Sequence, residues 1–433
     1  MFVVTKFGGS SLSCAKQFKK VRDIVLADPM RKIVVVSALG KRDANDSKIT
    51  DLLYILHAHL KYSVPYEDVW KIIYDRYVEV RDDLKLDYKI EDELDLIAGQ
   101  LDKNIPQDYL VSRGEFLAAK LMSRYLGYEF LDAKDVIEFN YDGTVNFDAT
   151  GRKTKEKVAQ LKKVVVPGFY GAYGNGVIKL FSRGGSDITG SIMAKCVNAT
   201  VYENWTDVSG IMVTDPRIVK NPKSIKEITY NELRELSYMG ANVLHEDSIF
   251  PVQELNIPIK ILNTNEPECP GTIISNECKD NSQAITGIAG KKNFVAITVY
   301  KDHMSNEVGF LRKCLSIFEK YDISIEHVPT GIDNLSIVVA RDQVEKCLYE
   351  LVVDLKQELG AEVTLWEDIA LIAVVGRNMA HKCGLCGKLL SVLGENGVNM
   401  KMIDQGPDEL NIILGINNCD YEKAIKVIYD NLM

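Results

Sequence analysis

The chain has 433 residues, of which 46% are apolar and 26% charged, a composition typical of globular proteins with more than one hydrophobic core. Its formal net charge of −9 at pH 7 gives no general basic surface, so nucleic acid is not expected as a partner. We find no run of about 18 apolar residues that would predict a membrane span, and no signal peptide. The nine cysteines are odd in number and scattered, which favours reduced thiols and a cytoplasmic location.

The first part of the chain alternates predicted strands with predicted helices. The β-branched runs Phe2–Phe7 and Ile33–Ala38 suit strands of a parallel sheet that is covered on both faces, and residues 51–104 have mostly helical periodicity. Further strands are predicted at Lys163–Pro167, Val177–Phe181, Ala199–Asn204 and Pro258–Leu262. We expect an α/β fold, a three-layer α/β/α domain with a mainly parallel central sheet over residues 1–282. The polar stretch Asn263–Ser282 is interpreted as its boundary.

The remaining residues carry an internal repeat. A β-α-β-β-α-β pattern runs from Val295 to Trp366 and restarts at Ile369, which predicts two ferredoxin-like modules, 283–366 and 367–433. Elements predicted in the first module include the helices Gly309–Tyr321 and Gln343–Leu359 and the strands Ser324–Pro329, Leu335–Ala340 and Glu362–Trp366. The second copy lacks its sixth element, and a missing edge strand would leave backbone groups unpaired. We expect residues 284–289 to fill that place, which would interleave the modules.

Two glycine loops, each between a predicted strand and a predicted helix, share one design. They are Lys6–Ser11 (KFGGSS) and Arg183–Asp187 (RGGSD). Glycines let the backbone approach a phosphate closely, and the free N–H groups of the following helix attract anions. With one cation beside each loop, the pair suits phosphoryl transfer. Neither loop matches GxxxxGK[ST] or GxGxxG, and an ordinary βα turn is the alternative for either loop taken alone.

Six motifs in order carry a family resemblance: KFGGSS (6–11), VVSA (35–38), KITDLL (48–53), LVSRGEF (110–116), SRGGSD (182–187) and WTDVSGIMVTDPR (205–217). Together they resemble the motifs of aspartate kinases (aspartokinases) of the amino acid kinase family, and the C-terminal modules resemble paired ACT domains. The lysine-sensitive monofunctional type is the most similar. The resemblance implies a transferase that moves the γ-phosphoryl group of ATP to the β-carboxylate of L-aspartate. The product would be 4-phospho-L-aspartate, at the first step of lysine, threonine and methionine biosynthesis.

The same resemblance implies roles for single residues. Lys6 and Asp187 would be catalytic, with Lys6 stabilising the transferring phosphoryl group and Asp187 positioning the cationic groups. Arg183 would hold the substrate α-carboxylate and Glu115 the α-ammonium, as guanidinium and carboxylate groups can. The substrate pocket would be completed by Ser37, Thr50 and Ser186. The nucleotide would be held by Lys6, Gly8, Gly9, Ser10, Thr206, Asp207, Met212, Arg217, Asn242 and Val243, and Mg²⁺ mainly by the nucleotide phosphates.

The residues alone leave plainer alternatives open. Glu115 and Arg217 also suit exposed charged loops, Asp187 the acidic first turn of a helix, and Thr50 a helix cap. Three positions depart from the family pattern. Ser10 replaces a threonine and keeps the hydroxyl, whereas Asn242 replaces a lysine near the phosphates, which should weaken ATP binding unless another cation substitutes. Met212 replaces a tyrosine near the base, where methionine packs with less defined geometry.

The first ACT-like module resembles an amino-acid sensor. The residues implied in effector binding are Met304, Glu307, Gly309, Phe310, Leu311, Ser324, Ile325 and Glu326. Glu326 or Glu307 could take an ammonium, and the alternative is that both are solvated. We expect inhibition by lysine, alone or together with threonine, at a contact between subunits, so a homodimer or tetramer is expected.

Two competing functions remain. The first is another member of the fold, such as a glutamate, acetylglutamate or uridylate kinase, against which the Arg183 and Glu115 clamp and the ACT-like modules argue. The second is a non-catalytic amino-acid sensor with Asn242 as the lesion. The retained Lys6 and Asp187 favour an active enzyme.

Overall fold

The computed structural model describes all of the chain except Met1, Arg183, Asn242, Val243, His245, residues 280–283, Asn378, Ala380, His381 and Pro407, and the side chain of Glu246. The chain forms two compact units. The first consists of Met1–Ile211, Ser224–Asn231 and Asn242–Lys279, and the second of Met212–Lys223, Glu232–Ala241 and Asp280–Met433. Helix α9 (Tyr230–Tyr238) therefore begins in the first unit and ends in the second. The expected domain limits themselves stay a prediction.

The first unit is built on an eight-stranded sheet with the order β3-β5-β2-β1-β8-β10-β11-β9. Its strands are β1 (Val3–Phe7), β2 (Arg31–Val36), β3 (Glu129–Phe130), β5 (Val164–Pro167), β8 (Val201–Thr206), β9 (Glu227–Thr229), β10 (Ile259–Asn263) and β11 (Thr272–Ser275). Neighbouring strands are parallel except β10 with β11. Strands β1 and β5 are buried along their whole length, which explains their unbroken apolar runs.

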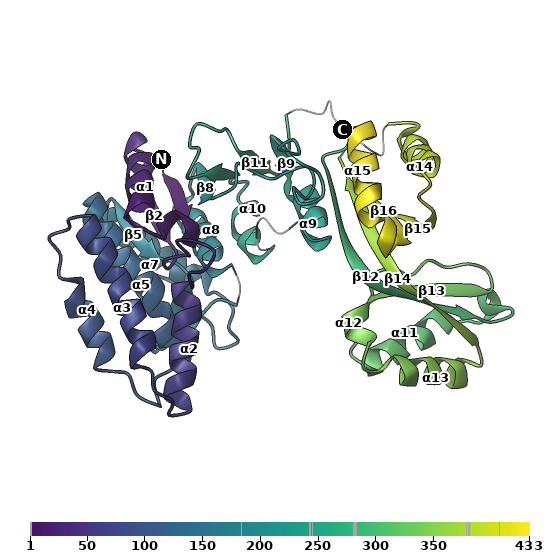
Figure 1. The fold of residues 1–433 in the computed structure, drawn as a ribbon, viewed down its shortest axis with the longest axis horizontal. Helices are drawn as coiled ribbons and strands as arrows, with labels where there is room; N and C mark the ends of the chain where they lie inside the picture. The colour runs from purple at the N-terminus through teal and green to yellow at the C-terminus, as the bar shows by residue number, and fades with distance from the viewer. Residues whose placement is uncertain are drawn as a thin grey trace. The chain divides into compact units, whose positions relative to one another are not determined.

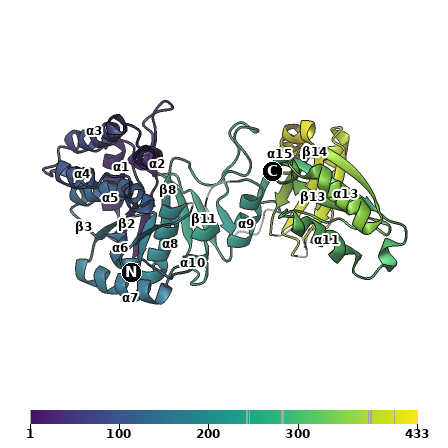
Figure 2. The ribbon, with the colours of Figure 1, turned by 90° about the horizontal axis from the view of Figure 1, so that it is seen from below.

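Helices cover both faces of this sheet, with α1 and α5 on one side and α7 and α8 on the other (Figures 1 and 2). The helical segments are η1 (Gly9–Leu12), α1 (Ala15–Ala27), α2 (Ile49–Lys61), α3 (Glu67–Asp83), α4 (Ile90–Ala98), α5 (Gln107–Leu126), α6 (Ala133–Val136), α7 (Phe147–Leu161), α8 (Gly185–Val197), η2 (Glu246–Ser248) and α10 (Phe250–Gln253). A small sheet contains β4 (Glu138–Phe139), β6 (Tyr170–Tyr173) and β7 (Ile178–Leu180). The three-layer class is confirmed, but the polar stretch interpreted as a boundary contains strand β11.

The second unit contains a five-stranded antiparallel sheet with the order β13-β12-β14-β16-β15. Its elements are β12 (Gly287–Tyr300), η3 (Met304–Asn306), α11 (Phe310–Lys320), β13 (Asn334–Ala340), α12 (Arg341–Val344), α13 (Leu348–Leu359), β14 (Glu362–Val375), α14 (Leu385–Glu395), β15 (Met400–Gln405), β16 (Asn411–Asn417), η5 (Asn418–Asp420) and α15 (Tyr421–Leu432). Each of the two predicted repeats has its own hydrophobic core, but the second strand of the first repeat is not among the five.

The two repeats share the long strands β12 and β14. The segment Phe294–Tyr300 of β12 pairs with β13 of the first repeat. The segment Gly287–Lys291 of β12 pairs instead with the last residues of β14, and those residues pair on their other side with β16 of the second repeat. Asn293 and Asp368 adopt left-handed backbone conformations, with φ of 68° and 61°, where the strands pass from one repeat to the other. The strands predicted before and after residue 368 are thus one bent strand.

Two local predictions were wrong. The segment Ser324–Pro329 forms only one isolated bridge, through His327, and a second lies just beyond it at Thr330; Pro329 supplies no N–H to a ladder. The long helix expected at Gln343–Leu359 is divided into α12 and α13.

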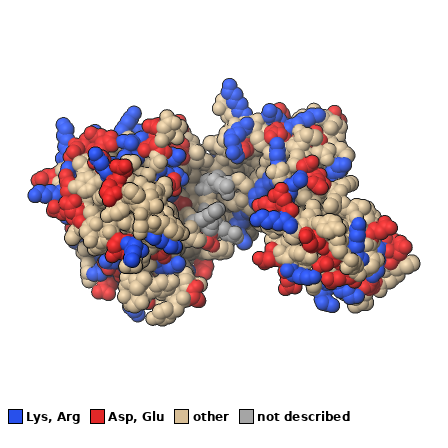
Figure 3. Space-filling view, turned by 60° about the horizontal axis from the view of Figure 1, so that its bottom comes forward, with Lys and Arg blue, Asp and Glu red and all other residues tan. Residues whose placement is uncertain are grey.

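Acidic and basic side chains are interspersed on the visible surface of each unit (Figure 3). All nine cysteines are free. Within the described residues, every helix is too short or too polar to cross a membrane.

Candidate active site

A cavity of about 1210 Å³ opens in the first unit where β1, β2 and β8 end. These parallel strands all point their carboxyl ends toward it, the usual place for a ligand in an open α/β sheet. The predicted site residues that line it are Lys6, Gly8, Gly9, Ser10, Ser37, Thr50, Glu115, Ser186, Asp187, Thr206 and Asp207. Met212 and Arg217 do not line it and belong to the second unit. Arg183, Asn242 and Val243 lie outside the described residues.

The centre of the cavity is a three-residue network of Lys6, Asp187 and Asn204. The Lys6 ammonium lies 2.6 Å from Asp187 Oδ1 and 3.4 Å from Asn204 Oδ1, while Asn204 Nδ2 donates to Asp187 Oδ1 at 2.7 Å. Lys6 and Asn204 are register partners in β1 and β8, and Asp187 lies in the first turn of α8. Asn204 was missed from the sequence, although a polar residue in a buried strand was a usable signal.

The first glycine loop packs directly against a second loop. The Gly9 carbonyl accepts a hydrogen bond from the Gly40 N–H at 2.9 Å. A Cβ on Gly40 would lie only 2.4 Å from the carbonyl carbon of Gly9, so no side chain fits there without moving backbone. In the other glycine loop, Gly184 has a φ of 61° at the start of α8. The first glycine loop therefore requires a glycine at position 40, which the motifs did not identify.

Glu115 is a buried carboxylate on α5 that lines the cavity. It is 3% exposed, and its Oε2 has no hydrogen-bond partner among the described residues. Burial raises the pKa of Glu115 to about 8, more than the N–H of Ala38 and the charge of Arg113 can lower it. The Arg113 guanidinium does not pair with it but lies over the ring of Phe116, 4.5 Å from its centre. The site therefore contains an acceptor that a cationic ligand would satisfy.

The structure decides between several of the open alternatives. Glu115 is not in an exposed turn, because it is buried within α5. Thr50 does not cap α2, since Lys48 is the N-cap residue and makes no side-chain capping bond. Arg217 does occupy an exposed loop, where its side chain is 88% exposed and its Nη2 lies 2.6 Å from Asp215.

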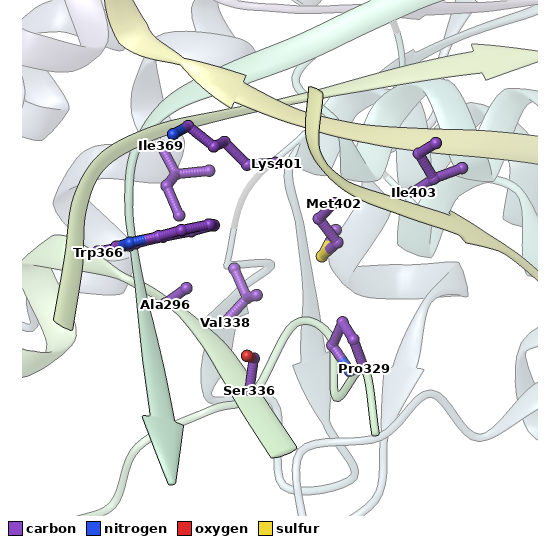
Figure 4. Close-up of a pocket in the computed structure, with 9 residues that line it drawn as sticks. All are labelled: Ala296, Pro329, Ser336, Val338, Trp366, Ile369, Lys401, Met402 and Ile403. Atoms are coloured by element: carbon purple, nitrogen blue, oxygen red, sulfur yellow. The ribbon is translucent and has the colours of Figure 1, made fainter. Parts of the chain in front are cut away.

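The second unit has a separate, smaller groove of about 270 Å³ on its sheet (Figure 4). The side chains around it include Trp366, Met402, Ile403 and Lys401, whose ammonium lies 4.6 Å from the centre of the Trp366 ring. The residues predicted to bind an effector do not line this groove. It is mostly apolar and contains no cluster of charged groups.

The predicted effector residues lie instead around the start of α11. Met304 and Phe310 are buried in the first repeat's core, Gly309 has a φ of 81°, and Leu311 is partly exposed. Glu307 is held by Lys301 and Lys313 at 2.6 and 2.7 Å, and these hydrogen bonds lower its pKa.

Glu326 has a different partner. The N–H groups of Ser324 and Glu326 donate to Gln343 and Val338, and Ile325 is half-buried between them. The Glu326 carboxylate accepts a hydrogen bond from the Tyr238 hydroxyl of α9. Burial and this bond raise the pKa of Tyr238 to about 12. Of the two candidate acceptors for an effector ammonium, Glu326 is the one for which the described residues show no ion pair with a lysine.

Comparisons with known proteins agree across the chain. The model of the "Amino acid kinase family" matches residues 1–263, and that of the "ACT domain" matches 372–432. The chain is 36% identical to Aspartokinase 3 of Bacillus subtilis over 98% of this chain and 97% of that protein. It is 46% identical to the aspartate kinase structure of Clostridium acetobutylicum, with a TM-score of 0.92 over 100% of both chains. Escherichia coli aspartokinase III, solved with aspartate and ADP and with lysine and aspartate, gives a TM-score of 0.76 at 26% identity over 100% of both chains.

Proposed function

The chain belongs to the amino acid kinase family, within it to the aspartokinases with ACT domains, and we propose that its first-unit cavity transfers the γ-phosphoryl group of ATP to the β-carboxylate of L-aspartate. The observation that carries this proposal is the buried Oε2 of Glu115, which has no hydrogen-bond partner among the described residues and lies in the same cavity as the Lys6–Asp187 pair. A phosphate site alone would have no use for a buried carboxylate. An amino acid that accepts a phosphoryl group would use both the Lys6–Asp187 pair and the Glu115 carboxylate.

The reaction needs no general base. The β-carboxylate is ionised at neutral pH and forms a bond from its oxygen to Pγ. The bond from Pγ to the oxygen that bridges Pβ and Pγ breaks, and ADP leaves with the electron pair, so no proton is transferred. Lys6 neutralises charge on the moving phosphoryl group, and Asp187 and Asn204 hold its ammonium in place.

The substrate clamp is proposed to have two charged ends. Glu115 pairs with the α-ammonium, and Arg183 holds the α-carboxylate by bidentate hydrogen bonds. Ser37, Thr50 and Ser186 complete the acceptor pocket, and Gly8, Gly9, Ser10, Thr206 and Asp207 line the nucleotide side. Met212, Arg217, Asn242 and Val243 remain proposed nucleotide contacts. Glutamate is one methylene longer, so its side-chain carboxylate would overreach Pγ when its α-groups are held.

Mg²⁺ is proposed as the metal, carried mainly by the nucleotide phosphates. The cavity suits this arrangement, because Asp207 provides a carboxylate whose described contact is only a 3.2 Å hydrogen bond from Thr206. The bound ion supplies charge neutralisation at the phosphates. The protein's own residues orient the acceptor carboxylate and keep Lys6 aligned.

Regulation is proposed to act through the second unit. Lysine, alone or with threonine, would inhibit the enzyme by binding at Met304, Glu307, Gly309, Phe310, Leu311, Ser324, Ile325 and Glu326. Glu326 would take the effector ammonium, which would compete with Tyr238 for that carboxylate. We further propose a homodimer or tetramer formed through the ACT domains, in the cytoplasm.

A coupled assay of ADP release tests the function. We expect turnover with ATP, Mg²⁺ and L-aspartate, little with L-glutamate, and inhibition when lysine is added. Turnover with glutamate in preference to aspartate would assign the chain to a different amino-acid kinase. Absence of turnover in folded protein that still binds lysine would support the non-catalytic sensor.

A further inference from the structure

Two lysines of the cavity have no role in the reaction as derived so far. Lys41 and Lys48 both line the cavity and are exposed, and neither ammonium makes an ion pair or hydrogen bond with the described residues. Lys6, by contrast, forms an ion pair with Asp187, with 2.6 Å between its ammonium and Asp187 Oδ1. Lys41 and Lys48 are therefore the cations of this lining, as far as it is described, that remain available to a ligand.

The loop that carries these lysines, residues 40–48, is closed at its base. The Ile49 N–H donates to the Leu39 carbonyl at 3.2 Å, so the two ends of the loop lie side by side. The ends bear Lys41 and Lys48. Closing the base in this way brings both lysines to the same part of the cavity lining.

The loop is also anchored by two arginines, Arg42 within it and Arg76 outside it, which both bind Asp46. Asp46 accepts hydrogen bonds from the Arg42 N–H at 2.9 Å and from the Arg76 guanidinium at 2.7 Å. Arg76 is itself buried and donates to the Gly40 carbonyl at 2.9 Å. Burial alone would raise the pKa of Asp46, but the bonds from Arg42 and the charge of Arg76 outweigh it and lower the pKa to about 2. Asp46 thus stays ionised and bound to arginine rather than to lysine.

The anchored loop starts at the phosphate loop. The Gly40 N–H donates to the Gly9 carbonyl, and the two backbones are so close that Gly40 has no room for a side chain. Lys41 follows Gly40 directly. Its side chain therefore begins beside the first glycine loop, Lys6–Ser11, which is the proposed phosphate loop. A lysine acts on phosphate as a flexible point charge and needs no fixed geometry.

We propose that Lys41 and Lys48 bind the terminal phosphates of the nucleotide and set its affinity, while Lys6 acts on the transferring group. This inference rests on the proposed function and names the residues that hold the polyphosphate. It predicts that removing their charge weakens ATP and ADP and leaves aspartate binding unchanged.

The test compares Lys41→Met, Lys48→Met and the double variant with Lys103→Met, a surface lysine beside a different pocket. Kinetics give kcat and the KM for ATP and for aspartate, and calorimetry gives the Kd for ADP without aspartate. We expect each single change to raise the KM for ATP and the Kd for ADP about tenfold, or about 1.4 kcal/mol. The KM for aspartate should stay within about twofold, and Lys41→Arg should restore most of the affinity.

Two results would overturn the inference. Nucleotide constants within about twofold of the unmodified protein in the folded double variant would make these lysines solvated surface residues. A rise in the KM for aspartate alone would assign them to the acceptor. If the unmodified protein releases no ADP with aspartate, the proposed function fails instead, and the ADP calorimetry still decides the role of the lysines.

Discussion

The buried carboxylate of Glu115 makes the KM for aspartate depend on pH. In the free protein, burial raises the pKa of Glu115 to about 8, so the protonated form dominates at neutral pH. The substrate ammonium pairs with the ionised form. Substrate binding must therefore release a proton from Glu115 below pH 8, and affinity must rise as pH rises toward that pKa.

The size of the effect follows from the titration of one group. With a pKa of about 8, roughly one molecule in a hundred has Glu115 ionised at pH 6 and roughly one in eleven at pH 7. The KM for aspartate should fall about ninefold from pH 6 to 7 and about fivefold from pH 7 to 8, then level off. Glu115→Gln cannot ionise, so its KM should be raised and independent of pH.

The assay is a series of aspartate titrations from pH 6 to 8.5 at saturating ATP and constant ionic strength, with the KM for ATP as the internal control. Calorimetry in two buffers of different ionisation enthalpy would count the released proton. A KM for aspartate that is flat in the unmodified protein would refute the reasoning. The same pH slope in Glu115→Gln would also refute it, because another group would then be titrating.

Three further predictions concern the glycine contact, the catalytic cation and the regulatory hydrogen bond. Gly40→Ala should lower stability by about 1–3 kcal/mol and raise the KM for ATP, because its Cβ meets the Gly9 loop backbone; thermal melts should show no such loss for Gly151→Ala, whose Cβ meets nothing within 4 Å. Lys6→Met should lower kcat about a hundredfold or more with little change in the KM for aspartate; a dominant effect on that KM would exchange its role with that of Arg183. Tyr238→Phe removes the hydrogen bond to Glu326 and frees this carboxylate for the effector. The lysine concentration for half-inhibition should then fall about fivefold, with kcat in the absence of lysine unchanged. An unchanged half-inhibition concentration would show that this hydrogen bond has no part in regulation.

Much of the fold could be predicted because its signals are local. The predicted runs Phe2–Phe7 and Ile33–Ala38 contain the buried stretches Val3–Phe7 and Ile33–Val36, and strands buried on both faces need no alternation of polar residues. The repeat was visible because each βαββαβ unit buries its own core. Strand β11 was missed because it lies in a segment rich in proline and polar residues, and its pairing with β10 and β9 supplies what local sequence lacks.

The site could be predicted only in part, because motifs name residues and not their partners. The glycine loops and Lys6 follow from strand-to-helix patterns. Asn204, which completes the network with Asp187, is 198 positions from Lys6 along the chain and meets it only through the register of β1 and β8. Gly40 was equally hidden, since a requirement for no side chain comes from a long-range backbone contact. Met212 and Arg217 are part of the motif 205–217 but belong to the second unit.

Trapping the acyl phosphate with hydroxylamine tests the central claim most directly, since a phosphorylated carboxylate yields a hydroxamate. With ATP, Mg²⁺ and L-aspartate, we predict aspartate β-hydroxamate in step with ADP release, and little hydroxamate from L-glutamate. Folded protein that binds ADP but forms no hydroxamate from aspartate would contradict the assignment of the cavity to phosphoryl transfer onto the β-carboxylate.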